Sequence, residues 1–163
     1  MKTLSIMVLT GFLFGCATPP QTVNDFRADF KGGPKSTKVE KHEVNRPFAN
    51  VYDDIKSHSD KCLNVVVTAA TSGSSGLQRS AIRYRSTTRK TGDQAGEMVL
   101  QLAKEAPEKM PEGGYFTLLT DIGSISADRT RITIYGPSVM YDDAFDAIFS
   151  WARGKDRICP SLP

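Results

Sequence analysis

The spacing of apolar residues changes several times along this chain, and each change marks an expected element. Between residues 46 and 63 apolar side chains recur every three or four positions, which predicts an amphipathic helix with one buried stripe. The stripe consists of Phe48, Val51, Tyr52, Ile55, Ser59 and Cys62. A second helix is predicted over 139–153. Its stripe consists of Tyr141, Ala144, Phe145, Ile148 and Ala152. Asn45 is placed to cap the first helix and Gly154 to end the second.

Elsewhere the spacing shortens to two or gives way to short β-branched runs, which is typical of strands joined by turns. Strands are expected at 37–45, 64–70, 80–89, 98–103, 115–122 and 130–135. The order β-α-β-β-β-β-β-α predicts an α+β fold: an antiparallel sheet of five to six strands with two helices on one face. This order resembles that of helix-grip domains, in which a curved sheet wraps round a long C-terminal helix. The resemblance is architectural and does not define a function.

The first fifteen residues follow neither period. Lys2 precedes a mostly apolar run over residues 4–14, and the small residue Gly15 follows it. Such a run is too short to span a bilayer as a helix, which takes about 20 residues. A basic residue, a short apolar run and a small residue together indicate a secretory signal peptide.

The sequence Leu13-Phe14-Gly15-Cys16 resembles the lipobox of bacterial lipoproteins. Leu13, Gly15 and Cys16 match that pattern, while Phe14 stands where a smaller residue is usual. In that family the Cys thiol receives a diacylglyceryl group, the preceding peptide is removed, and the new N-terminus is acylated, commonly with palmitate. The resemblance implies lipidation of Cys16. Because Ala17 rather than Asp follows, it also implies sorting to the outer membrane, with the domain on the periplasmic side.

The chain therefore divides into three expected regions: a signal peptide over 1–15, a lipid anchor and flexible tether over 16–36, and a single periplasmic α+β domain over 37–163. The tether contains Pro19, Pro20 and other turn-forming residues. Phe26 and Phe30 lie four positions apart within it. They could form one helical turn or dock on the domain, and the alternative is a solvated linker with two apolar residues.

Composition fits this division. Removal of fifteen from 163 residues leaves about 148, enough for one domain with a core. The net charge of +3 falls to about +2 without Lys2, which gives no argument for a nucleic-acid partner. With Cys16 lipidated, Cys62 and Cys159 remain. In an oxidising compartment they are expected to form a disulfide, the alternative being two independent buried thiols.

No motif in the chain indicates an enzyme, and no cofactor is expected. The sequence Gly73-Ser74-Ser75-Gly76 lacks the residues of a phosphate-binding loop and is interpreted as a turn. A metal site could use His58, Asp54 and Cys62, but it would consume a cysteine that the disulfide explains better. We therefore expect no metal site.

One unusual surface feature is a basic strand. It contains Arg79, Arg83, Arg85, Arg89 and Lys90. Arg83, Arg85 and Arg89 share a strand face that points outward if the helices cover the other one. Outward arginines can bind anionic lipid head groups, envelope polysaccharide or an acidic partner protein. The alternative is a charged face that prevents sheet aggregation, paired with Glu97 or Asp93.

These features favour a non-catalytic binding or envelope-assembly module. The second hypothesis is a carrier or sensor of an apolar ligand held between the sheet and the last helix, lined by Phe145, Ile148, Phe149 and Trp151. At helical spacing such residues also describe an ordinary core. An envelope hydrolase is a third hypothesis, for which the sequence shows no catalytic base.

Overall fold

Six strands form one antiparallel sheet in the order β1-β6-β5-β4-β3-β2. The structure, a computed structural model, describes residues 19–30, 37–73, 76–103, 111–137, 140–156 and 158–163. The strands are β1 (Thr37–Val44), β2 (Val66–Gly73), β3 (Gly76–Gly92), β4 (Ala95–Ala103), β5 (Tyr115–Ser126) and β6 (Arg129–Pro137). The predicted α+β class and antiparallel sheet are confirmed, with six strands.

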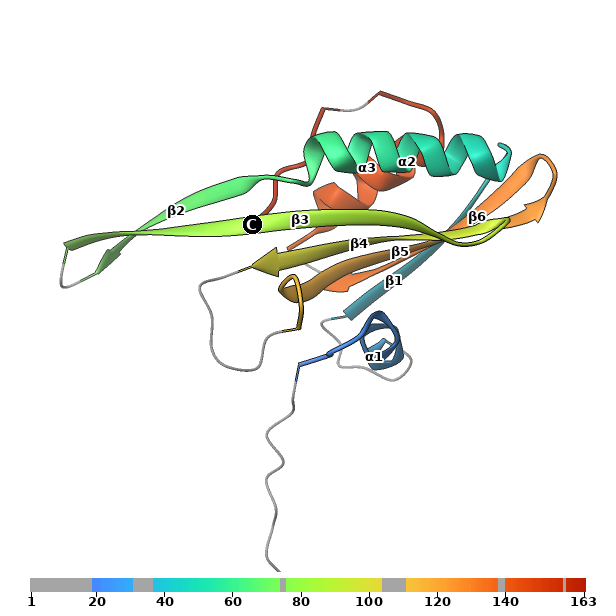
Figure 1. Cartoon of the computed structure of the whole chain (residues 1–163). Coiled ribbons are helices and arrows are strands. Elements are labelled where there is room, and N and C mark those ends of the chain that lie inside the picture. The colour runs from blue at the N-terminus through green and yellow to red at the C-terminus, as the bar shows by residue number, and fades with distance from the viewer. Residues whose placement is uncertain (1–18, 31–36, 74–75, 104–110, 138–139, 157) are drawn as a thin grey trace, which may run out of the picture.

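Two helices cover one face of this sheet, as predicted: α2 (Phe48–Cys62) and α3 (Asp142–Ala152) (Figure 1). All six residues of the predicted α2 stripe are buried. They pack on the inward side chains of the central strands, among them Leu100, Leu118 and Ile132. Among the described residues, no helix is both long and apolar enough to cross a bilayer.

The expected caps differ in outcome. Helix α2 begins at Phe48 with Pro47 at the cap position, and no side chain caps it. The prediction for Asn45 is therefore wrong, because that residue lies two positions too early. At the end of α3 Gly154 has a φ of +72°, the left-handed conformation that glycine adopts without strain. The prediction for Gly154 is confirmed.

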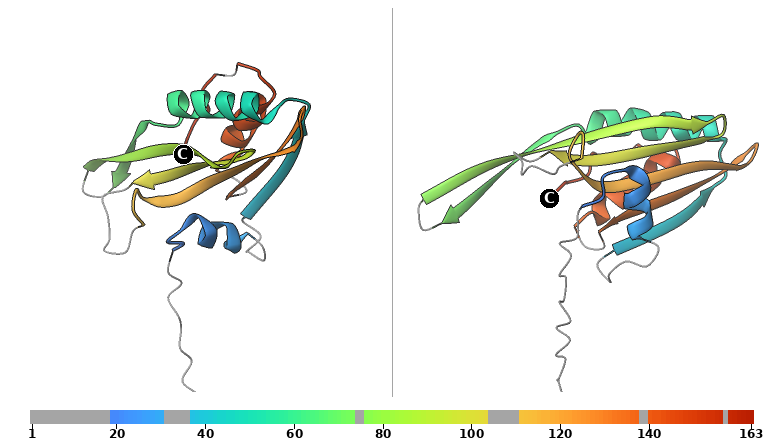
Figure 2. Two further views of the ribbon diagram at one scale, coloured as in Figure 1. Left: turned by 45° about the vertical axis from the view of Figure 1, so that its right-hand side comes forward. Right: turned by 60° about the horizontal axis from the view of Figure 1, so that its bottom comes forward.

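A third helix, α1 (Val23–Asp29), lies against the opposite face of the sheet (Figure 2). Thr22 and Asp25 form a reciprocal capping box at its start. Phe26 is buried and contacts the Phe116 ring at 5.9 Å between centroids. The segment that contains Phe26 and Phe30 therefore docks on the sheet, which was one of the two alternatives. The expectation of a flexible tether over 16–36 is wrong for the residues of α1.

The hairpin of β2 and β3 extends beyond the rest of the sheet (Figures 1 and 2). Among the described residues, β3 pairs with β4 from Arg83 onward, and its segment 76–82 pairs with β2. We call Val66–Gly73 together with residues 76–82 the arm. Val67 and Ile82 at the root of the arm pack against the main core, and the hairpin extends from there.

Candidate functional site

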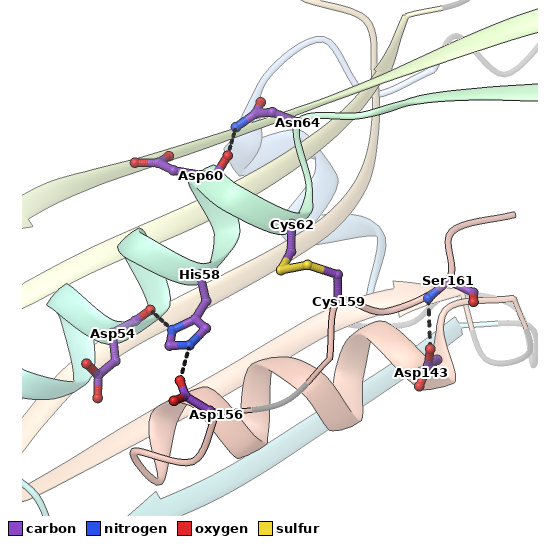
Figure 3. The surroundings of a disulfide bond; sticks show 9 residues. All are labelled: Asp54, His58, Asp60, Cys62, Asn64, Asp143, Asp156, Cys159 and Ser161. Atoms are coloured by element: carbon purple, nitrogen blue, oxygen red, sulfur yellow. Dashed lines mark hydrogen bonds and ion pairs between the residues drawn. A yellow bond between two sulfur atoms is a disulfide. The ribbon is translucent and has the colours of Figure 1, made fainter.

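The root of the arm is fixed by a disulfide. Cys62, the last residue of α2, is bonded to Cys159 in the C-terminal tail, with 5.1 Å between their Cα atoms (Figure 3). The predicted pairing is confirmed. The tail is also held by hydrogen bonds: the Ser161 N–H donates to Asp143 Oδ2 (2.8 Å), and the Tyr84 hydroxyl donates to the Pro163 carbonyl oxygen (2.6 Å). The end of the chain is thus fastened to α2, α3 and β3.

Further contacts join the start of β2 to β3. The Tyr84 N–H donates to the Val65 carbonyl oxygen (2.8 Å), and the Ser86 N–H donates to Asn64 Oδ1 (2.9 Å). Burial, together with a hydrogen bond to Tyr141, raises the pKa of Tyr84. A hollow of about 270 Å³ lies at this root. It is lined by Asn64, Val65, Val66, Arg83, Tyr84 and Arg85.

The alternation of β3 separates the predicted basic residues. Tyr84 is buried on the helix side, so Arg83, Arg85 and Arg89 lie on the α1 side of the sheet. Lys90 faces α2, where its ammonium lies 5.6 Å from the Tyr52 ring centroid. Arg79 belongs to β3, but its side chain is outside the described structure. The prediction of one five-residue basic cluster therefore needs correction, because Lys90 leaves it.

Arg89 has a structural role. Its Nη2 lies 2.6 Å from Oε1 of Glu97, a residue only 4% exposed. Arg27 of α1 contacts the other oxygen of Glu97 at 3.2 Å and binds both oxygens of Asp121, at 3.0 and 2.7 Å. The hydrogen bond to Asp121 is the main factor that raises the pKa of Arg27. These ion pairs connect α1 to β3, β4 and β5. They also engage the Arg89 guanidinium, which is therefore not free to bind a partner. The expected pairing of a basic strand residue with Glu97 holds for Arg89.

Arg83 and Arg85 are different. Five other described arginines are ion-paired with carboxylates: Arg27, Arg46, Arg89, Arg129 and Arg131. Arg153 lies 5.1 Å from the Phe149 ring centroid. Among the arginine side chains that the structure describes, Arg83 and Arg85 alone have neither kind of partner, and both are exposed. Their cross-strand neighbours on β4, Ala103 and Gln101, carry no charge. We call Arg83 and Arg85 the free arginine pair.

The residues predicted to line an apolar ligand site belong to the core instead. Phe145, Ile148 and Trp151 are at most 1% exposed and pack in the main cluster. A Cβ atom added to Gly136 would lie 2.9 Å from the Phe145 ring, so the ring sits directly on β6. Phe149 is half-buried and stacks on His42, with 3.9 Å between ring centroids. The simpler interpretation as core residues therefore holds for the first three.

The three residues considered for a metal site do not converge on one point. His58 Nδ1 contacts the backbone oxygen of Asp54 (2.9 Å), and its Nε2 contacts Asp156 Oδ1 (3.0 Å) (Figure 3). The Asp54 carboxylate pairs with Arg46 instead, and Cys62 is in the disulfide. Within the described ranges no group of three metal-binding side chains occurs. Cys16 lies outside those ranges.

Comparison with known proteins returns no match, either among models of protein families or among curated sequences. The site is therefore defined by its own geometry. Sequence reasoning missed the docking of Arg27 and the uncharged outer edge of β2. The spacing of Thr22 and Asp25, a capping-box pattern, was the available signal for α1.

Proposed function

We propose that this protein is a lipoprotein, anchored through Cys16 to the periplasmic face of the outer membrane, and that it acts as a non-catalytic binding module in envelope assembly. Its binding surface is the free arginine pair at the root of the arm. The observation that carries this proposal is a contrast within the described part of the chain: Arg83 and Arg85 are exposed with no partner among the described residues, while the other described arginines are paired or lie over a ring.

Two unpartnered arginines on one strand suit an anionic target. Residues two positions apart on a strand face the same way, roughly 7 Å apart. Each guanidinium presents several N–H donors in a fixed fork that matches a carboxylate or phosphate. The hollow beside Val66 and Arg83 gives such a group a recess next to the strand.

The proposed location rests on residues outside this surface. The lipobox-like sequence ending at Cys16 supports lipidation. The Cys62–Cys159 disulfide is consistent with an oxidising compartment, since such bonds are rare in the reducing cytosol.

The anchor is tested by metabolic labelling with palmitate in a bacterial host. We expect the full-length chain to incorporate label and to fractionate with outer membranes, and a Cys16→Ser variant to lose both properties. Equal labelling of the two chains, or an unprocessed cytosolic product, would contradict the proposal.

The binding surface is tested separately, by photo-crosslinking in cells from a probe placed at Thr87, an exposed neighbour of the free arginine pair. The Arg83→Ser/Arg85→Ser variant is expected to lose adducts at least tenfold, because each charge-assisted hydrogen bond contributes about 1.5–3 kcal/mol. The matched control is Arg129→Ser/Arg131→Ser, which removes the same charge from arginines paired with Glu43. Equal adduct yields from both double variants would exclude the free arginine pair as the surface.

A further inference from the structure

Strand β2 is an edge of the sheet, and its outer side has no partner strand among the described elements. Its register with β3 runs from Val66–Arg83 to Gly73–Gly76 without a shift. In contrast, the pairings β3–β4, β4–β5 and β5–β6 each contain an irregularity. The edge of β2 is therefore the regular side of a hairpin that extends from the body.

The backbone groups on this edge can be assigned from one hydrogen bond. Because the Tyr84 N–H donates to the Val65 carbonyl oxygen, residue 65 is in a hydrogen-bonded pair with β3. Antiparallel ladders alternate, so Val66 and Thr68 direct their N–H and C=O groups away from β3. Both residues are exposed, Val66 at 56%. A row of outward donors and acceptors is a template for another strand.

The composition of β2 contains none of the features that commonly prevent an edge strand from pairing with another strand. Natural sheet edges are commonly protected by charged residues, proline or a bulge. The eight residues of β2, Val-Val-Thr-Ala-Ala-Thr-Ser-Gly, include neither a charge nor a proline, and the register contains no bulge. An isolated two-stranded hairpin is also only marginally stable, so a third strand would stabilise the arm.

The free arginine pair indicates which strand would bind. An added strand would lie about 5 Å beyond β2 and roughly 10 Å from β3. Long side chains of opposite charge, such as arginine and glutamate, can meet across that distance. A second copy of this chain would present its own β2, which carries no carboxylate to pair with these arginines.

We propose that β2 binds an extended, acidic segment of another protein by strand addition, with Arg83 and Arg85 pairing to its carboxylates. This proposal rests on the proposed function, because it specifies the partner of the same surface. The main-chain hydrogen bonds supply affinity, and the arginines select for acidic sequences.

The probe is a fluorescent nine-residue peptide of alternating Glu and Val, with a Lys/Val peptide of equal length as control. Binding to the full-length protein is measured by fluorescence anisotropy, and hydrogen exchange of the β2 amides is measured in parallel. We expect saturable binding of the Glu/Val peptide, at least tenfold weaker binding of the Lys/Val peptide, and slower exchange at Thr68 in the complex.

Two substitutions at one position isolate the backbone contribution. Thr68→Pro removes an outward N–H, whereas Thr68→Ala keeps it and changes only the side chain. We expect Thr68→Pro to weaken peptide binding at least tenfold and Thr68→Ala to change it less than twofold. If Thr68→Pro does not fold, Val66→Pro makes the same test at the first residue of the strand, where proline is tolerated.

The arginine variants separate this proposal from the proposed function. If Arg83→Ser/Arg85→Ser loses cellular adducts while the proline variant binds peptide like the wild type, strand addition is wrong and the free arginine pair stands. Absence of saturable Glu/Val binding, or equal binding of both peptides, overturns the proposal. So does binding to phosphatidylglycerol vesicles without peptide binding, or a dimer in which β2 is already protected.

Discussion

The two edges of this sheet are built in opposite ways. Five of the eight residues of β1 are ionisable: Lys38, Glu40, Lys41, His42 and Glu43. Lys38 contacts both Glu40 and Asp142 at 2.7 Å, and Glu43 contacts Arg131 at 2.7 Å. Strand β2 has no ionisable residue. Most ionisable side chains of β1 are therefore paired, whereas β2 presents its main chain without charged side chains.

The body of the sheet and the arm also differ in how far helices cover them. Helices α2 and α3 cover one face of the body, and α1 packs near β5 on the other (Figure 2). In the described structure, residues 76–82 of the arm pair with β2 and with no other strand, and Val67 and Ile82 at its root pack against the core. The β1 edge is therefore stabilised by paired charges, whereas the arm over residues 76–82 depends on main-chain pairing between its own two strands in the described structure. Three changes test this comparison.

The largest effect is expected from the disulfide at the root of β2. Replacing Cys62 and Cys159 by Ala opens a loop with a sequence separation of 97 and should cost about 2–5 kcal/mol of unfolding free energy. Urea unfolding followed by circular dichroism measures this cost. The matched control is the reduced wild type, which should unfold like the double variant. Equal stability of the reduced and oxidised wild type would show that the bond does not support this end of the sheet.

A smaller effect is expected from Glu97, whose carboxylate links α1 to the sheet. The Glu97→Ala variant leaves Arg27 and Arg89 without one acceptor and should cost about 2 kcal/mol, because charge-assisted hydrogen bonds are lost from a buried site. Limited proteolysis should then cleave earlier near α1.

Asp128→Asn is the charge-matched control, since Asp128 is exposed and accepts its side-chain hydrogen bond from Ser126, within the same turn. It should leave both the stability and the cleavage pattern unchanged. If Glu97→Ala behaves in the same way, the Arg27–Asp121 pair and the apolar packing of Phe26 suffice to hold α1 in place.

The smallest effect concerns pH at the β1 edge. The hydrogen bond from Lys38, followed by that from His42, lowers the pKa of Glu40 below its usual value of 4.5. A lowered folded-state pKa means that the contribution is fully present above the unfolded pKa and is lost as pH falls through the folded one. Between pH 6 and 3 the melting temperature of the wild type should therefore fall more than that of Glu40→Gln. Parallel curves would show that this edge is not stabilised by its charges.

The features best predicted from the sequence are those that depend on the local spacing of apolar residues. All six residues of the α2 stripe are buried, and the strands fall near their expected positions because alternation or short β-branched runs between turns mark them locally. It failed at α1, since that helix has only seven residues and its docking depends on Asp121, 94 positions from Arg27. The sequence also could not show that Arg89 is ion-paired whereas Arg83, in the described structure, is not. Both lie on one strand face, and only the register opposite Ala103 or Glu97 distinguishes them.

The docked helix α1 also changes how far an anchored body could travel. With lipid on Cys16, a linker over residues 17–36 would contain twenty residues, but α1 reduces it to the six residues 17–22. For a flexible chain the effective concentration of a tethered group varies with about the −3/2 power of linker length. With the proposed anchor at Cys16, the shorter linker would raise the effective concentration of the body near the membrane about sixfold, which would favour partners at the same surface.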